Sequence, residues 1–272
     1  MNFVSHYVAH QPDERGIVHY SDEEQLVWKT LFERQIKNIP GRACDEYLEG
    51  LSKLELSSRA IPQIPEINQR LKTLSGWQVT PVASIIPERE FFELLANRHF
   101  TVATFIRRMD ELDYATEPDI FHEVFGHCPM LTNPVYAEFI YNFAQKVLSL
   151  PEEYWPLMQR VFWHTVEFGL INTMNGLRVY GGGILSSIHE TAYSTESNIP
   201  MRVIFNPVNA LRTPYRMDCL QQVYFVINSY QDLYKFIDYD IHQIIQLAKT
   251  LKEYPPFFPV EDNNPNIHIG VL

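Results

Sequence analysis

Two histidines and a distant glutamate place the strongest constraint on how this chain can fold. His122 and His127 stand five residues apart, and Glu167 follows forty residues later. Two imidazoles and one carboxylate can hold a first-row divalent metal and still leave coordination positions open, which is typical of oxygen-activating non-haem iron sites. If these three side chains share one metal, the fold must bring two separate segments together.

The spacing of the histidines conflicts with an ideal α-helix. Zinc proteases carry His-Glu-x-x-His, with histidines four residues apart on one helix face and a glutamate as base. Here His122-Glu123 begins in the same way, but His127 comes one residue late, which argues against a zinc hydrolase. Five residues turn an α-helix by about 500°, so the rings would point roughly 140° apart. Both can reach one metal only if the helix ends or unwinds, which Gly126 and Pro129 favour; two ordinary histidines at a helix end remain the alternative.

Glu167 lies in a segment expected to be helical over about residues 152–171. The side chains three and four positions away from it are largely apolar. An unpaired carboxylate on such a face would cost several kcal/mol and therefore needs a partner. A divalent cation is one such partner, and a salt bridge to Arg160 or simple exposure to solvent are the others.

Helix signals dominate the rest of the chain. A capping box at residues 21–24 starts a helix that Pro40-Gly41 stops. Periodicity predicts further helices over 43–56, 65–74, 87–97, 133–148 and 232–252. Strands are predicted at 77–82 and 223–227. We expect one mainly α domain with a few short β-strands over residues 1–272, with a core at about 20–254 and a Pro-rich tail at 255–272.

Charge and cysteine content exclude several classes of partner. The formal net charge is -11, which would repel phosphate backbones, so no nucleic-acid partner is expected. Cys44, Cys128 and Cys219 are odd in number and widely spaced, which favours a reducing, cytoplasmic setting over a disulfide framework. Residues 1–15 do not form a signal peptide, and the sequence has no apolar stretch of eighteen residues for a membrane.

Three motifs together resemble one known family. The runs from Glu117 to His127, from Trp163 to Leu170 and from Tyr180 to Ser187 are similar in order and spacing to those of the pterin-dependent aromatic amino acid hydroxylases, in particular their bacterial phenylalanine 4-hydroxylase branch. The resemblance extends over residues 20–254 and implies the helical catalytic domain of that family. Gly181-Gly182-Gly183 alone would only hint at a dinucleotide loop, and its flanks do not form a βαβ unit.

The resemblance implies iron(II) held by His122, His127 and Glu167, with a tetrahydropterin, either tetrahydrobiopterin or a bacterial equivalent, as the second cofactor. The implied reaction is a monooxygenation that uses O2 to convert L-phenylalanine to L-tyrosine. Hydroxylation of tryptophan by the same kind of site is the alternative, and a zinc-dependent hydrolase is a more remote one.

The same matching implies the pterin contacts. Phe91 corresponds to the phenylalanine that stacks on the pterin ring, as an aromatic face binds a planar heterocycle. Ile86 belongs to the loop at the pterin edge, and Glu123 corresponds to a glutamate that faces the pterin. Periodicity alone would instead place Phe91 in the core.

The substrate contacts follow in the same way. Arg107 corresponds to the arginine that forks onto the substrate carboxylate, with Asp119 holding it in position. Trp163 and Pro118 would pack against the substrate ring, and Ser186 would help at its polar end. Without the resemblance, Arg107 would be a surface arginine and Trp163 a core aromatic residue.

Some positions depart from the animal members of the family. Ala115 and Phe162 lack hydroxyl groups that the animal phenylalanine enzyme carries near the site. Met217 lies in a region that separates substrate preferences. The animal enzymes also carry a regulatory domain and a tetramerisation helix, for which we find no counterpart in this sequence, so a monomer or small oligomer is expected.

Overall fold

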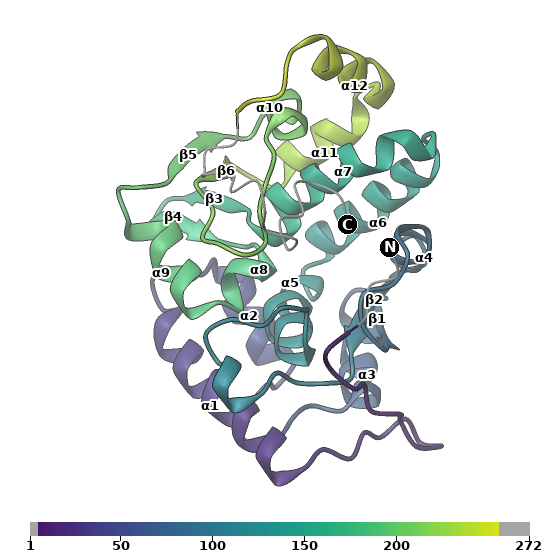
Figure 1. Cartoon of the computed structure of the whole chain (residues 1–272), viewed down its shortest axis with the longest axis vertical. Helices are drawn as coiled ribbons and strands as arrows, with labels where there is room; N and C mark the ends of the chain where they lie inside the picture. Colours follow the sequence, from purple (N-terminus) through teal and green to yellow (C-terminus); the bar gives the residue numbers. More distant parts are fainter. Residues whose placement is uncertain (1–4, 256–272) are drawn as a thin grey trace.

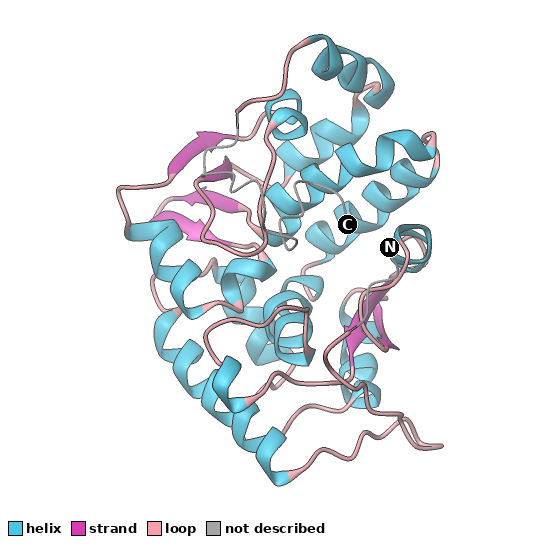
Figure 2. Cartoon of the chain, viewed as in Figure 1, coloured by secondary structure: helices cyan, strands magenta, loops and turns pink. Residues whose placement is uncertain are grey.

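Helices make up most of the computed structural model, which describes residues 5–255 (Figure 1; Figure 2). The predicted mainly α fold with short strands is confirmed, and residues 256–272 of the predicted tail lie outside the described residues. The α-helices are α1 (Asp22–Asn38), α2 (Asp45–Lys53), α3 (Ile64–Leu74), α4 (Glu88–Leu95), α5 (Cys128–Leu131), α6 (Pro134–Leu148), α7 (Trp155–Phe162), α8 (Gly182–Leu185), α9 (Ile188–Glu196), α10 (Pro207–Arg212), α11 (Gln231–Asp238) and α12 (Ile241–Thr250).

The strands form two small sheets. Strands β1 (Gln78–Val82) and β2 (His99–Ala103) pair in parallel, with α4 in the connection between them. The second sheet has the order β4-β3-β6-β5. Its strands are β3 (Leu170–Thr173), β4 (Gly176–Val179), β5 (Met201–Ile204) and β6 (Val223–Ile227). Figure 1 shows the two sheets on opposite sides of the molecule, with helices between them.

The helix starts follow the capping chemistry of the sequence. At α1 the Ser21 side chain accepts from the Glu24 backbone N–H while the Glu24 side chain accepts from the Ser21 backbone, so the predicted capping box is confirmed. At α6 the Asn133 side chain accepts from two backbone N–H groups of the first turn, and Pro134 occupies the first helical position. These local signals fix where the helices around the site begin.

Two predicted helices are wrong in extent. The segment predicted as one helix over 152–171 contains a short 3-10 turn, α7 and a π-helical segment (Trp163–Glu167), and then becomes strand β3 at Leu170. A short apolar run suits a buried strand as well as a helix, and pairing with β6 decides between them. The predicted helix over 232–252 is two helices, because the Asp240 side chain caps the start of α12.

Aromatic packing orients the histidine segment. Residues Phe121–His127 form a second π-helical segment, against which α1 packs. Trp28 meets Phe121 edge to face at 5.4 Å, and Phe32 meets Phe125 in the same way at 5.4 Å. Phe121 and Phe125 stack on each other at 4.7 Å between ring centroids. Such contacts between buried rings fix the rotation of the segment about its own axis.

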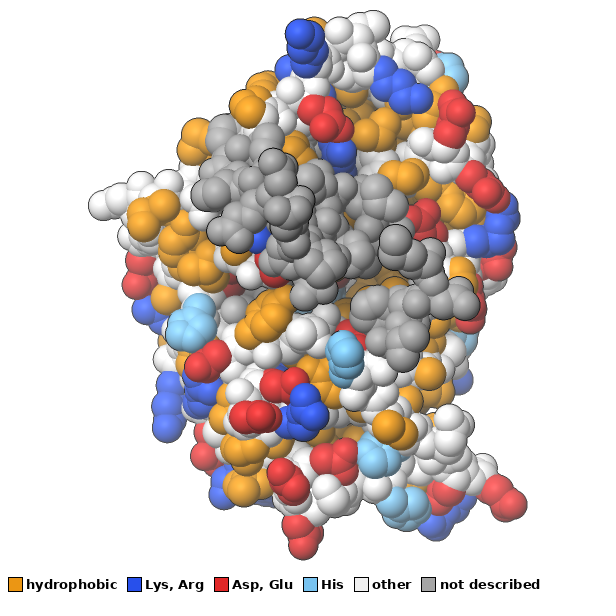
Figure 3. All heavy atoms as spheres, viewed as in Figure 1, with side chains coloured by type: hydrophobic (Ala, Val, Ile, Leu, Met, Phe, Trp, Pro, Cys, Tyr) orange, Lys and Arg blue, Asp and Glu red, His pale blue; other side chains and the backbone are white. Residues whose placement is uncertain are grey.

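The surface charges, the cysteines and the helix lengths agree with the composition. Figure 3 shows acidic and basic side chains interspersed over the face in view. Cys44, Cys128 and Cys219 are all free thiols, and the first two are buried. Within residues 5–255, the helices are too short or too polar to cross a membrane.

Candidate iron centre and active site

The π-helical segment resolves the conflict in histidine spacing. In a π-helix the hydrogen bonds run between residues five apart, so such residues lie one turn apart on the same side. His122 and His127 are separated by that distance, and the next residue, Cys128, donates its backbone N–H to the Glu123 carbonyl in the same register. The helix continues into α5, so the predicted end near Gly126 and Pro129 is wrong, whereas the alternative of local unwinding is confirmed, because a π-helix turns less per residue than an α-helix. A change of helical register, rather than an end, brings the rings together.

The three candidate ligands converge on one point. The His122 Nε2 and His127 Nε2 atoms lie 3.2 Å apart. Glu167 Oε2 lies 3.2 Å from His127 Nε2 and 3.6 Å from His122 Nε2. Neighbouring ligand atoms that share a metal at about 2.1 Å and at right angles lie roughly 3 Å apart. The spacing of this donor set therefore fits a divalent metal bound on one face, as in a two-histidine, one-carboxylate site.

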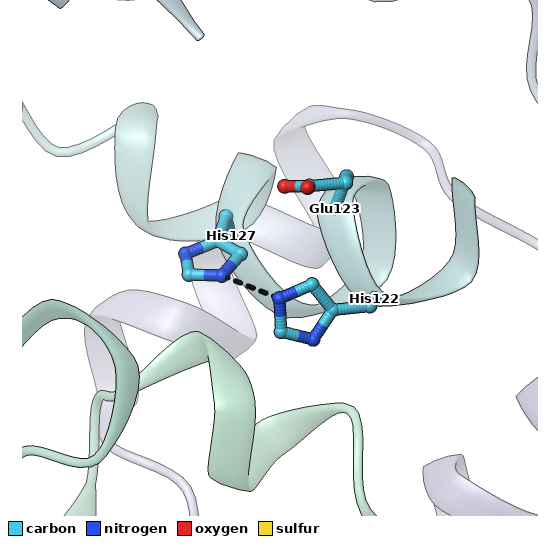
Figure 4. A group of neighbouring side chains, drawn as sticks. All are labelled: His122, Glu123 and His127. Atoms are coloured by element: carbon cyan, nitrogen blue, oxygen red, sulfur yellow. Dashed lines mark hydrogen bonds between the residues drawn. The ribbon is translucent and has the colours of Figure 1, made fainter. Parts of the chain in front are cut away.

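Glu123 is a second carboxylate near the histidines. Its ligand oxygen lies within 4.8 Å of both ring nitrogens, and Figure 4 shows it projecting beside the two facing rings. Burial raises the pKa of Glu123 well above its ordinary range, and the carboxylates of Glu167 and Asp119 raise it further. Burial also opposes the charge of Glu167, but His127 and His122 outweigh it and lower the pKa of that carboxyl group. Glu167 is the closer carboxylate and the one held in the charged form, so it fits the metal better.

Surrounding groups hold the ligands in place. The Ser186 hydroxyl lies 2.9 Å from His122 Nδ1, which leaves Nε2 facing His127 and Glu167. Burial lowers the pKa of His122 to about 4, so its ring is neutral, as a metal ligand must be. A Cβ atom on Gly182 would lie 2.4 Å from the His127 ring. Only glycine permits α8 to approach the centre this closely.

Arg107 and Asp119 form a buried ion pair next to the histidines. Nε and Nη2 of Arg107 each donate to one Asp119 oxygen at 2.8 Å. Burial opposes both charges, but the pair outweighs it, so the pKa of Asp119 falls and that of Arg107 rises. Asp119 also accepts from the His122 backbone N–H at 2.9 Å. Two of the five N–H donors of the guanidinium are used by Asp119, and the others include both on Nη1, which can bind an anionic group.

Trp163 belongs to an aromatic group that the sequence did not reveal. Its indole stacks with Phe168 at 4.5 Å and with Tyr215 at 4.2 Å between ring centroids. The indole N–H donates to Gln221 Oε1 at 3.2 Å. Phe168 directly follows Glu167, so this group borders the metal ligands. Tyr215 and Gln221 are distant from Trp163 in the sequence. The sequence pointed to them only through Met217, which lies between them in a region that separates the substrate preferences of family members.

The candidate pterin residues lie on and before α4. The Phe91 ring is half-buried and meets Phe162 edge to face at 5.5 Å between centroids. The absence of a hydroxyl on Phe162 suits this apolar contact with Phe91. Ile86 is half-buried in the loop before α4.

Two other residues named from the sequence lie near the site. Pro118, a candidate substrate contact, is half-buried next to Asp119. Arg160, an alternative partner for Glu167, instead binds Glu253 at 2.6 Å.

Comparison with known proteins identifies the family of the chain. The sequence profile of the biopterin-dependent aromatic amino acid hydroxylases matches residues 4–255. Phenylalanine-4-hydroxylase of Pseudomonas aeruginosa is 49% identical over 94% of this chain and 97% of its own length. The solved structure of phenylalanine hydroxylase from Legionella pneumophila has a TM-score of 0.91 and 61% identity, covering 93% of this chain and 100% of that one.

A related structure contains the expected metal. Phenylalanine hydroxylase of Chromobacterium violaceum with bound Fe(III) has a TM-score of 0.86 and 39% identity, and the match covers 93% of this chain and 92% of that one. The family profile covers nearly the whole chain, and the donor set of the site fits its chemistry. The chain is therefore a member of the biopterin-dependent aromatic amino acid hydroxylase family.

Proposed function

We propose that the protein is a phenylalanine 4-monooxygenase that uses iron(II), a tetrahydropterin and O2 to convert L-phenylalanine to L-tyrosine. In this reaction one oxygen atom of O2 would enter the tyrosine hydroxyl, and the tetrahydropterin would supply two electrons and take up the other oxygen atom. The observation that carries the proposal is the convergence of His122, His127 and Glu167 within 3.2–3.6 Å in a chain of this family. The relatives with phenylalanine hydroxylase names favour phenylalanine over tryptophan.

The metal and pterin would be held by separate parts of the site. His122, His127 and Glu167 would ligate the iron, and Phe91 would stack on the pterin with Ile86 at its edge. Glu123, whose pKa burial raises, would face a polar edge of the pterin. When bound, iron and tetrahydropterin together supply the activation of O2 and the electrons for it.

The protein's own residues would position the substrate. Arg107, held by Asp119 through two hydrogen bonds, would bind the amino acid carboxylate with its remaining N–H groups. The aromatic group around Trp163, with Pro118, would contact the substrate ring. Ser186, whose hydroxyl is 2.9 Å from His122 Nδ1, would help to bind the polar end of the substrate. The aromatic side chains around Trp163 would help to keep water away from the reacting ring.

The test is a direct product analysis. Protein loaded anaerobically with iron(II) is mixed with tetrahydrobiopterin, O2 and either L-phenylalanine or L-tryptophan, and products are identified by mass. We expect tyrosine, formed in proportion to pterin oxidised, and a lower rate with tryptophan. Formation of hydroxytryptophan without tyrosine would overturn the assigned specificity.

A further inference from the structure

We propose that Glu117 is a positioning residue that joins the loop at residues 83–87 and the segment at 104–119 to the N-terminal segment at 5–10. This inference rests on the proposed function, because it takes the first loop as part of the pterin site and Arg107 as the substrate-binding group. Glu117 itself reaches no reacting atom in this account. It acts by fixing the loop at residues 83–87 relative to the segment at residues 104–119.

Both oxygens of the Glu117 carboxylate are occupied by donors from distant segments. Its side chain is buried, with 3% of the residue exposed. Oε1 accepts the backbone N–H of His6 at 3.0 Å, and Oε2 accepts the hydroxyl of Ser84. Hydrogen bonds to a charged group contribute more than neutral ones, and removal of a buried partner leaves the remaining group unsatisfied. Glu117 is thus the point where three segments meet.

The N-terminal segment also contacts the stretch of chain just before Arg107. The Tyr7 ring stacks on Phe105 at 4.5 Å, with the planes 6° from parallel. The Thr104 hydroxyl donates to the His10 carbonyl at 2.7 Å. Phe105 lies two residues before Arg107, so these contacts support the stretch that carries the guanidinium.

Glu117 is joined to the substrate pair through the chain itself. Asp119 is two residues further on, and it accepts the Arg107 backbone N–H at 2.9 Å in addition to the guanidinium contacts. The Ile120 backbone N–H donates to the Phe105 carbonyl at 2.9 Å. Two hydrogen bonds therefore hold the stretch around Arg107 against the stretch that follows Glu117.

On the pterin side, the anchor is Ser84. It lies two residues before Ile86 in the connection between β1 and α4, where Ala83, Ile85 and Pro87 are exposed. Within the described part of the chain, the bond to Glu117 is the side-chain hydrogen bond that ties residues 83–87 to another segment. Loss of this bond should allow the loop to sample other conformations, which lowers the affinity of any ligand that needs one of them.

The test compares Ser84→Ala, Glu117→Ala and Glu117→Gln with Ser52→Ala, a control at an exposed serine on α2. Iron(II)-loaded protein is titrated anaerobically with tetrahydrobiopterin and, separately, with L-phenylalanine by calorimetry, and thermal unfolding is recorded. We expect Ser84→Ala to weaken pterin binding about fivefold and phenylalanine binding less than twofold, because one hydrogen bond to the carboxylate is lost on the pterin side. Glu117→Ala should weaken both, and the amide of Glu117→Gln should restore most of each affinity.

Each outcome decides the inference. Wild-type pterin affinity in Ser84→Ala, or an equal loss of both ligands in that variant, would overturn the role of Glu117. If Glu117→Ala does not fold, Ser84→Ala and Glu117→Gln still decide. If the wild-type protein forms tyrosine but Ser84→Ala behaves like Ser52→Ala, only this inference fails. If the wild-type protein binds neither ligand and forms no tyrosine, the proposed function fails with it.

Discussion

The metal centre and the loops around it are held in different ways. The centre places His122, His127 and Glu167 on two π-helical segments, whose backbone hydrogen bonds and buried aromatic contacts fix each side chain. The loop at residues 83–87 is instead tied to another segment by the side-chain hydrogen bond from Ser84 to Glu117. A change at the centre should therefore abolish function, whereas a change in a loop should alter affinity by degrees.

The largest effect is expected for Glu167→Ala. It removes the one carboxylate that lies 3.2 Å from His127 Nε2, so iron-dependent tyrosine formation should fall by at least about a thousandfold, as for loss of a group that acts as part of a unit. The measurement is the initial rate at saturating iron(II). Glu153→Ala, at an exposed glutamate just before α7, is the control and should keep the wild-type rate. Full activity in Glu167→Ala would refute the ligand assignment.

A smaller but large effect is expected for Arg107→Lys. Lysine keeps the positive charge but loses the fork that meets Asp119 at two points, so kcat/KM for phenylalanine should fall about a hundredfold. Arg108→Lys, at the exposed neighbouring arginine, should have little effect. Steady-state kinetics with varied phenylalanine measure both. A loss confined to the pterin KM would place Arg107 elsewhere in the site.

Gly182→Ala tests how closely the centre is packed. The added Cβ would lie 2.4 Å from the His127 ring, so the ring must move away from its partners. We expect iron(II) affinity to fall by about tenfold, within the range for disturbed support of a ligand, while the apo protein keeps its far-UV circular dichroism spectrum. Anaerobic titration with iron(II) measures the affinity. An unchanged iron(II) affinity would show that the His127 ring can move without loss of binding, which would contradict the contrast between the centre and the loops.

The last prediction concerns the free energy of unfolding instead of activity or iron binding, and it involves Glu190, which accepts a hydrogen bond from the Gln221 backbone. Burial raises the pKa of Glu190 to about 7, although the Tyr224 hydroxyl and the Gln221 backbone N–H both donate to it. An unfolded glutamate titrates near 4.5, so between these values the folded protein holds a proton that the unfolded chain has lost. Its contribution to the free energy of unfolding is therefore full below about pH 4.5 and decreases by up to roughly 3 kcal/mol as the pH rises to about 7.

Glu190→Gln should remove this pH dependence, because an amide cannot ionise but can still accept both hydrogen bonds. Glu196→Gln, at an exposed position on the same helix, should retain the wild-type slope. Urea unfolding at several pH values between 4.5 and 8 measures the difference. Identical slopes in the wild-type protein and Glu190→Gln would exclude Glu190 as the source.

Much of the local structure could be predicted from the sequence. Capping chemistry at Ser21 and Asn133 is local, so the starts of α1 and α6 follow from a few residues. The end of the helix at Glu167 could not be predicted, because the apolar residues after it suit either a helix or a strand. Their pairing with β6, more than fifty residues away, decides the outcome.

The site was predictable in its ligands but not in its geometry. The types and order of His122, His127 and Glu167 indicated a metal, whereas the π-helical register depends on packing of Phe121 and Phe125 against α1. No local pattern encodes such a contact. Gln221 was missed for the same reason, since its role depends on a hydrogen bond to an indole 58 residues earlier.

Iron binding by two near-isosteric variants tests the central claim most directly. Glu167→Gln and Glu123→Gln each replace one of the two carboxyl groups near the histidines by an amide, and anaerobic equilibrium titration gives the iron(II) stoichiometry and affinity. We expect Glu123→Gln to bind one iron per chain with nearly wild-type affinity, and Glu167→Gln to bind at least about a hundredfold more weakly. Retention of tight binding in Glu167→Gln with its loss in Glu123→Gln would contradict the account.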